Sequence, residues 1–380
     1  MVSGTRGKRR RTRRPTSAAS RITPHGRSPR PLHGFRPSGS SAGSEPVATR
    51  HAERASCPVL AEKDRRFPLR RVARLFLCVL LYQPGLAMAE MIQIDGPDGP
   101  LGAELVAPDK ARDIVVIVPG SGPMDRDGNS PRMGLHSDSY KLLAEGLKAA
   151  GIASLRIDKR GFYASATAIS DPNEVTIGAY AGDVQKWVAR ASAVAPRVWI
   201  AGHSEGGLVA LVAARTPPRS LRGLILMATS GRPMGQLVIE QFRANPVNAE
   251  LMPDIESIVA DLEAGRGRDP ESLAPVLRPL FSDGLQRYMI DLFSHDPVTI
   301  AENWHGPTLI IQGDADLQVR PRDADLLSDA MPQAVRADLP GATHMLKLNV
   351  AGRPMDTYTN PALPLHPDLV ASIARFLEQE

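Results

Sequence analysis

The pattern of apolar and polar residues divides the chain near residue 89. Before this point, residues 1–66 show no apolar period of two or of 3.6 residues, so they cannot bury enough surface to offset the entropy cost of ordering. After it, short apolar runs alternate with amphipathic stretches up to the end of the chain. This alternation predicts strands that alternate with helices, and therefore an α/β fold.

Eight apolar runs in the second part predict strands. The run DIVVIV at 113–118 is almost continuously apolar, which indicates a strand covered on both faces. The predicted strands are 91–94, 101–107, 113–118, 153–158, 197–202, 223–228, 308–313 and 334–339. The predicted helices are 139–150, 177–193, 205–216, 322–331 and 367–377. Because helices connect most of the strands, we predict a mostly parallel, eight-stranded sheet with helices on both faces.

The alternation stops between residues 231 and 304. Methionine, leucine and phenylalanine recur there at helical spacing. Ligand sites of open α/β sheets lie at the carboxyl ends of the strands, so an insertion at this position predicts a helical lid over the site. We therefore expect one domain over 90–380 with a lid at about 231–304. Three methionines in or beside the predicted lid are expected to be core residues rather than ligand contacts. They are Met227, Met234 and Met252.

Charge separates the same two parts. The chain holds 46 Lys and Arg against 41 Asp and Glu, a net charge of +5. Residues 1–89 hold 19 basic and 4 acidic residues, which leaves 27 basic and 37 acidic residues, a balance of −10, for 90–380. We interpret 1–66 as a disordered basic tail, or as sequence upstream of a true start near Leu60 or Leu69. Nucleic-acid binding by this basic arm is the alternative, but an acidic domain disfavours a polyanion, and we expect no nucleic-acid partner.

Residues 67–89 have the three-part composition of a secretory signal. The basic sequence RRVAR precedes the apolar run 75–81, and a Pro-Gly break leads to small residues at Ala87 and Ala89. The run is shorter than the ~20 residues that span a bilayer, so we expect no stable membrane span. We predict cleavage after Ala89 and a periplasmic or secreted protein; a short buried helix is the alternative. Cys57 and Cys78 both precede the cut, which excludes disulfides and thiolate chemistry from the mature domain.

The strongest chemical motif is WIAGHSEGG at 199–207. The predicted strand 197–202 ends at Gly202, His203 and Ser204 follow it, and a helix begins at once at Glu205. A tight strand-to-helix turn leaves no room for side chains two positions from the serine, a need that Gly202 and Gly206 meet, and it exposes the serine oxygen. We predict that Ser204 is the nucleophile in a turn of this kind, which is called a nucleophile elbow. A serine that only caps the helix is the alternative.

A serine hydroxyl needs a base, and the base needs an acid that orients it. His344 follows the last predicted strand, and Asp316 follows the strand before it, with Asp314 as a rival two residues away. The order Ser204, Asp316, His344 is that of an α/β-hydrolase. We predict these three residues to be catalytic. Other histidines of the later chain are weaker candidates for the base. His136 and His366 are expected at the surface, and the other two candidates are His295 and His305.

The oxyanion of an acyl-transfer reaction needs two backbone donors. We assign them to the N–H groups of Glu205, at the start of a helix, and of Ser121, in the glycine-rich loop PGSGPMDRDGN at 119–129. A phosphate-binding loop is the alternative, but the lysine and serine of the P-loop motif are missing. No His, Asp and Glu cluster has metal-ligand spacing, so we expect no metal site.

The chain from about Met91 to Glu380 resembles the serine α/β-hydrolases, in particular the esterase and acyl-peptidase-like group with a helical lid after the sixth core strand. The motifs that carry the resemblance are PGSGPMDRDGN, RIDKRG, GHSEGG, QGDADLQV and GATHMLK, in this order. Pro119 departs from the HGGG form of lipases. The RIDKRG turn at 156–161 is expected to hold a buried salt-bridge network, with substrate contact as the alternative, and Asp125, Arg126 and Asp127 are expected to fix their loop.

The resemblance implies hydrolysis of carboxylic esters with small acyl groups through an acyl-serine, without a cofactor. The partner would be a small-molecule ester. Peptide or amide cleavage and acyl transfer would use the same three residues, so they stay open as alternatives. A non-catalytic binding protein that retains the fold is the alternative of another class. The sequence does not predict the oligomeric state.

Overall fold

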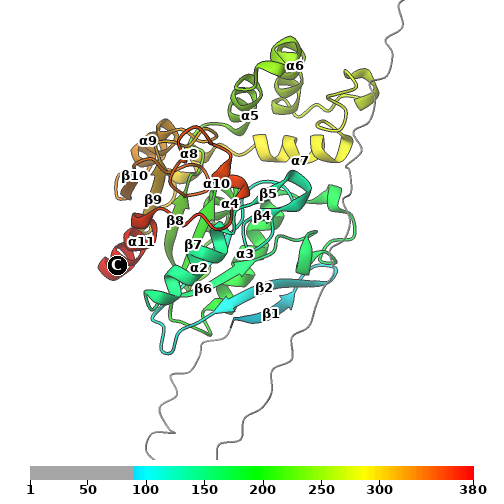
Figure 1. Cartoon of the computed structure of the whole chain (residues 1–380). Coiled ribbons are helices and arrows are strands. Elements are labelled where there is room, and N and C mark those ends of the chain that lie inside the picture. Colours follow the sequence, from blue (N-terminus) through cyan, green and yellow to red (C-terminus); the bar gives the residue numbers. More distant parts are fainter. Residues whose placement is uncertain (1–88) are drawn as a thin grey trace, which may run out of the picture. The chain divides into compact units, whose positions relative to one another are not determined.

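The computed structural model describes residues 89–380 (Figure 1). The predicted basic tail at 1–66, the signal segment up to Met88 and both cysteines lie outside the described residues. The structure therefore does not address the predictions made for them. Within the described part, no helix is both long and apolar enough to cross a membrane.

The domain is built on an eight-stranded, mostly parallel sheet, as predicted. Its strands are β1 (Glu90–Asp95), β2 (Pro100–Val106), β3 (Asp113–Val118), β6 (Ala153–Ile157), β7 (Arg197–His203), β8 (Leu221–Met227), β9 (Thr308–Gly313) and β10 (Val335–Leu339). They lie in the order β1-β2-β6-β3-β7-β8-β9-β10. β2 pairs antiparallel with β1 and with β6, and every other pairing in this sheet is parallel. The carboxyl ends of β3, β7, β8, β9 and β10 therefore meet at one edge.

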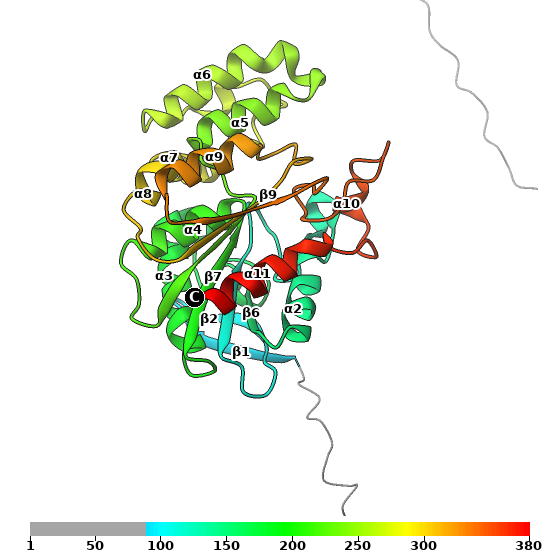
Figure 2. The ribbon, with the colours of Figure 1, turned by 90° about the vertical axis from the view of Figure 1, so that its left-hand side faces the viewer.

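Helices cover both faces of the sheet. On β3, Ile114, Val116 and Val118 pack into one buried cluster and Val115 and Ile117 into the other, which is why the run is continuously apolar. The first cluster includes residues of α3 (Ile177–Ala191), α4 (Glu205–Ala214), α8 (Pro297–Ala301) and α9 (Pro321–Ala330), and the second those of α2 (Ser139–Ala149) and α11 (Pro367–Gln379). Figure 2 shows α2 and α11 side by side on their face.

The segment between β8 and β9 is helical. It contains α5 (Met234–Arg243), α6 (Met252–Glu263) and α7 (Asp283–Phe293), which we call the insertion. α6 and the chain after it form a separate apolar cluster that includes Ile255, Ile258, Leu262 and Phe281. α8 lies in the predicted lid span but packs against α4 and α9, so it is part of the layer on the sheet.

The remaining elements are short and lie in the connections. They are β4 (Asn129–Ser130) and β5 (Leu135–His136), which form an antiparallel pair, and α10 (Asp356–Thr359). Short 3₁₀ helices occur at Pro131–Met133, Tyr163–Ser165, Pro172–Glu174, Pro246–Leu251 and Pro270–Ser272. Several of these short elements border the carboxyl edge of the sheet, where the candidate site lies.

Candidate active site

Ser204 occupies a strained turn between β7 and α4. Its backbone has φ 55° and ψ −122°, a conformation that costs energy for any residue with a side chain. The flanking glycines are required by space: a Cβ on Gly202 would lie 2.2 Å from the Gly206 carbonyl oxygen, and a Cβ on Gly206 would lie 2.3 Å from that of Val118. The turn therefore has the geometry predicted for a nucleophile elbow.

The structure pairs His344 with Asp316. The His344 Nδ1 lies 2.7 Å from Asp316 Oδ2, and both side chains are buried. Because an ionised carboxylate only accepts hydrogen bonds, Nδ1 carries the proton and Nε2 remains available as a base. The other carboxylate oxygen accepts from the N–H groups of Gln318 and Val319. Burial acts to raise the pKa of Asp316, but the charge of His344 and these hydrogen bonds outweigh it and hold the pKa below its usual value.

The rival residues are placed elsewhere. Asp314 is exposed and accepts a hydrogen bond from the Gly341 N–H at 2.5 Å, so it fixes the loop and does not touch His344. His305 is exposed, and His295 lies near Asp291. The surface position predicted for His366 is wrong: its side chain is buried, contacts the Pro340 carbonyl oxygen through Nε2, and caps α11 by accepting from the Asp368 N–H. His136 is exposed, as predicted.

His203 links the loops around Ser204. Its Nε2 lies 2.8 Å from the backbone carbonyl oxygen of His344, so this nitrogen donates, and its Nδ1 accepts from the Tyr140 hydroxyl at 2.7 Å. The same hydroxyl accepts from the Gly120 N–H at 3.1 Å. Burial, together with the charge of His344, lowers the pKa of His203 to about 3. His203 is therefore a neutral link between the glycine-rich loop, the elbow and the His344 loop.

The Gly120–Ser121 peptide is held in a fixed orientation. Lys159 Nζ donates to the Gly120 carbonyl oxygen at 2.7 Å. In a trans peptide the C=O and the next N–H point in opposite directions, so the Ser121 N–H points away from Lys159. A Cβ on Gly120 would lie 3.3 Å from the Ser204 Cβ, which shows how closely this loop approaches Ser204. The Glu205 N–H begins α4 and has no acceptor within the helix.

Charged residues around the RIDKRG turn form the predicted buried network. Arg126 pairs with Asp158 at 2.9 Å, and Arg160 pairs with Asp183 at 2.6 Å. Asp125 accepts from the N–H groups of Asp127 and Asn129, and Asp127 pairs with Arg156, so these loop charges fix their loop as expected.

Lys159 differs from the other charges of the turn because it reaches the site. Its ammonium group lies 3.2 Å from Glu205 Oε1, and both side chains are almost completely buried. Its Nζ also lies 5.0 Å from the centre of the Tyr180 ring. The sequence left salt bridge and substrate contact as alternatives for this turn, and Lys159 combines an ion pair with a place at the cavity wall.

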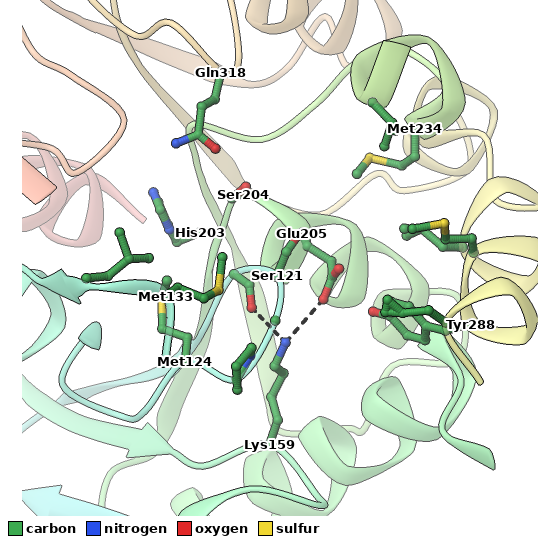
Figure 3. Close-up of a pocket in the computed structure, with 18 of the residues that line it drawn as sticks. Ser121, Met124, Met133, Lys159, His203, Ser204, Glu205, Met234, Tyr288 and Gln318 are labelled. Atoms are coloured by element: carbon green, nitrogen blue, oxygen red, sulfur yellow. Dashed lines mark hydrogen bonds and ion pairs between the residues drawn. The ribbon is translucent and has the colours of Figure 1, made fainter. Parts of the chain in front are cut away.

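Ser204 and His344 open into one cavity of about 630 Å³. The floor comes from the glycine-rich loop and the elbow, and the roof from α5 and α7 of the insertion (Figure 3). Methionines recur in the lining: Met124, Met133, Met234, Met289, Met345 and Met355. Of the methionines predicted to be core, Met227 and Met252 are buried in apolar clusters, whereas Met234 is buried and also lines the cavity. Methionine side chains are flexible and adapt to apolar ligands of different shape.

The sequence did not predict the tyrosines of the site. Tyr140 links the loops, and Tyr180 and Tyr288 line the cavity. Helical spacing marks Tyr140 and Tyr180 as ordinary core positions of α2 and α3, and nothing in the sequence distinguishes Tyr288. Within residues 89–380, no group of three or more His, Cys, Asp and Glu side chains is arranged to hold a metal ion.

The chain is similar in sequence to a known family and to a curated esterase. The family described as serine aminopeptidase, S33, matches residues 130–349. Esterase EstD of Thermotoga maritima is 27% identical over 216 residues, which are 56% of this chain and 48% of that protein; the chain thus spans about half the length of this curated relative.

Solved structures with similar folds include a thermophilic esterase from Thermogutta terrifontis and Est1E from Butyrivibrio proteoclasticus. The first is 17% identical, with a TM-score of 0.48, over 77% of this chain and 99% of that chain. The second is 19% identical, with a TM-score of 0.49, over 76% and 98%. The family match itself covers more than half of the sequence and includes the elbow, Asp316 and His344. The chain therefore belongs to the serine aminopeptidase S33 family of α/β-hydrolases.

Proposed function

We propose that the protein is a serine hydrolase that cleaves carboxylic esters with small acyl groups. One observation carries the proposal: a histidine held by a buried carboxylate and a serine in a strained elbow line the same cavity. This is the combination that activates a serine hydroxyl, since the base must be oriented and the nucleophile exposed. The similarity to esterase EstD supports the same activity.

The reaction would proceed through an acyl-serine. Ser204 Oγ attacks the ester carbonyl while His344 Nε2 takes its proton, and Asp316 stabilises the imidazolium through Nδ1. The N–H groups of Ser121 and Glu205 stabilise the negative oxygen of the tetrahedral intermediate. When the intermediate collapses, His344 gives the proton to the leaving alcohol. A water molecule, deprotonated by His344, then releases the acid and restores Ser204.

The lining of the cavity supports a neutral, largely apolar substrate. Among the described residues that line it, the carboxylate is Glu205 and the ammonium is Lys159, and these two are paired with each other. The rest of the wall is rich in methionine and leucine. An aminopeptidase substrate carries a free ammonium group, which needs an unpaired carboxylate. The paired state of Glu205 therefore favours an uncharged ester over a peptide with a free amino terminus.

The proposal is tested with p-nitrophenyl esters from acetate to octanoate. The wild-type protein should hydrolyse the shorter members, and Ser204→Ala should lower kcat by about 10⁴-fold or more, as for other serine hydrolases that lose the nucleophile. A fluorophosphonate probe should label the wild type and not the variant. The esterase proposal fails if no ester is turned over, or if the variant is as active as the wild type. Absence of labelling as well would favour the non-catalytic binding protein.

The alternatives on the same residues are separated by substrate. Aminoacyl p-nitroanilides report amide cleavage, and esters with added alcohols report acyl transfer. We expect both to be slower than ester hydrolysis. A higher kcat/KM for an aminoacyl anilide than for every ester of the series would identify a peptidase instead.

We further propose that the protein acts in the periplasm or is secreted. The proposal rests on the sequence of residues 67–89, up to the predicted cleavage site after Ala89. N-terminal sequencing of protein recovered from outside the cytoplasm should give Glu90 as the first residue. Recovery of the full chain from the cytoplasm alone would contradict it.

A further inference from the structure

Lys159 carries a buried charge that has no task in the reaction steps given above. It follows β6 in the RIDKRG turn, and its Nζ donates to the Gly120 carbonyl oxygen at 2.7 Å and to Glu205 Oε1 at 3.2 Å. The side chains of Lys159 and Glu205 are only 3% and 2% exposed, too little for contact with a substrate. A buried ion pair is often no more stabilising than apolar side chains of the same size, so stability is not a sufficient reason for this one.

Both ends of the ion pair adjoin the backbone donors assigned to the oxyanion. The Gly120 carbonyl and the Ser121 N–H belong to one planar, trans peptide, so a bond that fixes this oxygen also fixes the direction of the N–H. Glu205, the counter-ion, carries the second N–H in its own backbone. One ammonium group therefore connects the peptide of the first donor to the side chain of the residue that supplies the second. Figure 3 shows Lys159 below Ser121 and Glu205, with a dashed line to Glu205.

The glycine-rich loop needs such a restraint. Gly120 and Gly122, the latter at φ 75°, flank Ser121, and glycines give the backbone around them little intrinsic preference. The Ser121 N–H makes no hydrogen bond to any residue of 89–380, so its direction is fixed by other groups of the loop. Tyr140 accepts from the Gly120 N–H at 3.1 Å, and Lys159 donates to the Gly120 carbonyl oxygen. These two bonds hold the successive peptides on either side of Gly120.

Two tyrosines shield the ion pair from water. Lys159 Nζ lies 5.0 Å from the centre of the Tyr180 ring, and Tyr180 packs edge to face on Tyr288 with ring centres 6.4 Å apart. The Tyr288 hydroxyl lies beside the Glu205 carboxylate, and burial together with this charge raises its pKa. Hydrogen bonds to a charged group are stronger in such surroundings than in water. The pair is therefore suited to act as a rigid support behind the site.

We propose that Lys159 is a positioning residue: with Glu205 it forms a brace that keeps the Ser121 N–H aimed at the oxyanion. The inference rests on the proposed acyl-serine mechanism. Without the ammonium group, the Gly120–Ser121 peptide is free to rotate, and the N–H loses its alignment in part of the molecules. The tetrahedral intermediate then loses stabilisation, whereas the substrate, whose carbonyl oxygen carries little charge, binds almost as before.

The test compares Lys159→Met with the wild type on p-nitrophenyl butyrate. We expect kcat to fall by about 10- to 100-fold, less than the loss of a whole oxyanion donor, and KM to change by less than about twofold. A trifluoromethyl ketone forms a tetrahedral adduct with a serine oxygen and places a negative oxygen in the oxyanion site. Its affinity should fall by a factor similar to that of kcat. A merely structural role would not make the two losses follow each other.

Two further variants separate positioning from stability. Lys159→Met leaves the Glu205 carboxylate buried without a counter-ion, which is destabilising. The double variant Lys159→Met/Glu205→Gln removes this charge too, so it should fold and show the same loss of kcat. Arg160→Met is the matched control, because Arg160 is the next residue of the turn but pairs with Asp183. It should lower the melting temperature and leave kcat and the affinity for the ketone close to the wild-type values.

The brace is overturned if the folded double variant keeps the wild-type kcat and ketone affinity, or if Arg160→Met loses as much of both. It is also overturned if KM rises while kcat is unchanged, which would indicate substrate binding, or if neither Lys159 variant folds, which would give the pair a structural role. Failure of the esterase proposal is different. In that case the wild type itself does not hydrolyse p-nitrophenyl butyrate, and Ser204 is not labelled by a fluorophosphonate.

Discussion

The sheet edge around Ser204 and the insertion that covers it are stabilised in different ways. At the sheet edge, buried polar groups form a continuous chain of hydrogen bonds from Gly120 through Tyr140 and His203 to the His344 backbone. In the insertion, most of the buried residues are apolar. The buried Gln286 bonds only to the backbone of Arg268 and Phe281, and ion pairs such as Arg243–Glu256 lie at the surface.

This difference separates two tasks. A fully bonded polar network permits one geometry, whereas an apolar cluster keeps its stability through changes of detail if its volume is kept. The sheet edge is therefore suited to hold Ser204 and His344 in place. The insertion supplies α5 and α7 as the cavity roof and is suited to adapt to the substrate.

The largest effect should come from the acid of the sheet edge. Asp316→Asn keeps the size of the side chain but removes the charge that orients His344, so we expect kcat on p-nitrophenyl esters to fall by about 10⁴-fold, as for the equivalent change in serine proteases. Asp314→Asn is the matched control. It lies on the same loop but bonds to the Gly341 N–H, and kcat should change little. Equal losses in the two variants would remove the distinction between the two aspartates.

Two phenylalanines compare the regions directly. Phe281 fills the cluster of the insertion, and Phe376 packs edge to face on Trp199 under the sheet, with ring centres 5.4 Å apart. Each change to alanine should cost about 3–5 kcal/mol of local packing energy. Phe376→Ala should lower the denaturation midpoint of the whole domain. Phe281→Ala should act mainly on the insertion, raise KM, and leave the rate of fluorophosphonate labelling of Ser204 close to that of the wild type. A much slower fluorophosphonate labelling of Phe281→Ala would show that the insertion also positions Ser204.

The smallest effect concerns pH and arises at the sheet edge. Lys347 is buried, and its Nζ donates to the Ser137 and Asn360 carbonyl oxygens. Burial, opposed by the charge of Asp138, lowers its pKa to about 8, from an ordinary value of 10.5. Between these two values the unfolded chain binds a proton that the folded protein has released, so the free energy of unfolding rises with pH there.

We expect this rise to be about 1–3 kcal/mol between pH 7 and pH 10.5. The variant Lys347→Met has no group that titrates at this position and cannot show the rise. The difference in unfolding free energy between wild type and variant, measured with urea at both pH values, therefore gives the contribution of Lys347. The same difference at both pH values would mean that Lys347 keeps its ordinary pKa. The exposed ion pairs of the insertion should add little, because solvent screens them.

The sequence was sufficient for the sheet and for the order of the site residues. A short, continuously apolar and β-branched run, such as 113–118, indicates a strand covered on both faces, and glycines two positions from Ser204 have a direct steric reason. The sequence was not sufficient to predict the burial of His366, which was predicted at the surface and is buried, because the segments that cover this side chain are far away in the sequence. It also placed α8 in the lid, since helical spacing does not show which surface a short helix packs against.

By itself, the sequence determined which residue types stand at the carboxyl ends of the strands: the serine between glycines, the aspartates after β9 and the histidine after β10. These follow from local patterns, which short-range sterics and strand spacing control. Only the tertiary structure decided that His344 bonds to Asp316 and not Asp314, that Lys159 pairs with Glu205 next to Ser204, and that Tyr288 reaches the cavity from the insertion. The reason is that each contact joins segments distant in the chain or depends on where a loop directs one carboxylate. Periodicity carries information on neither.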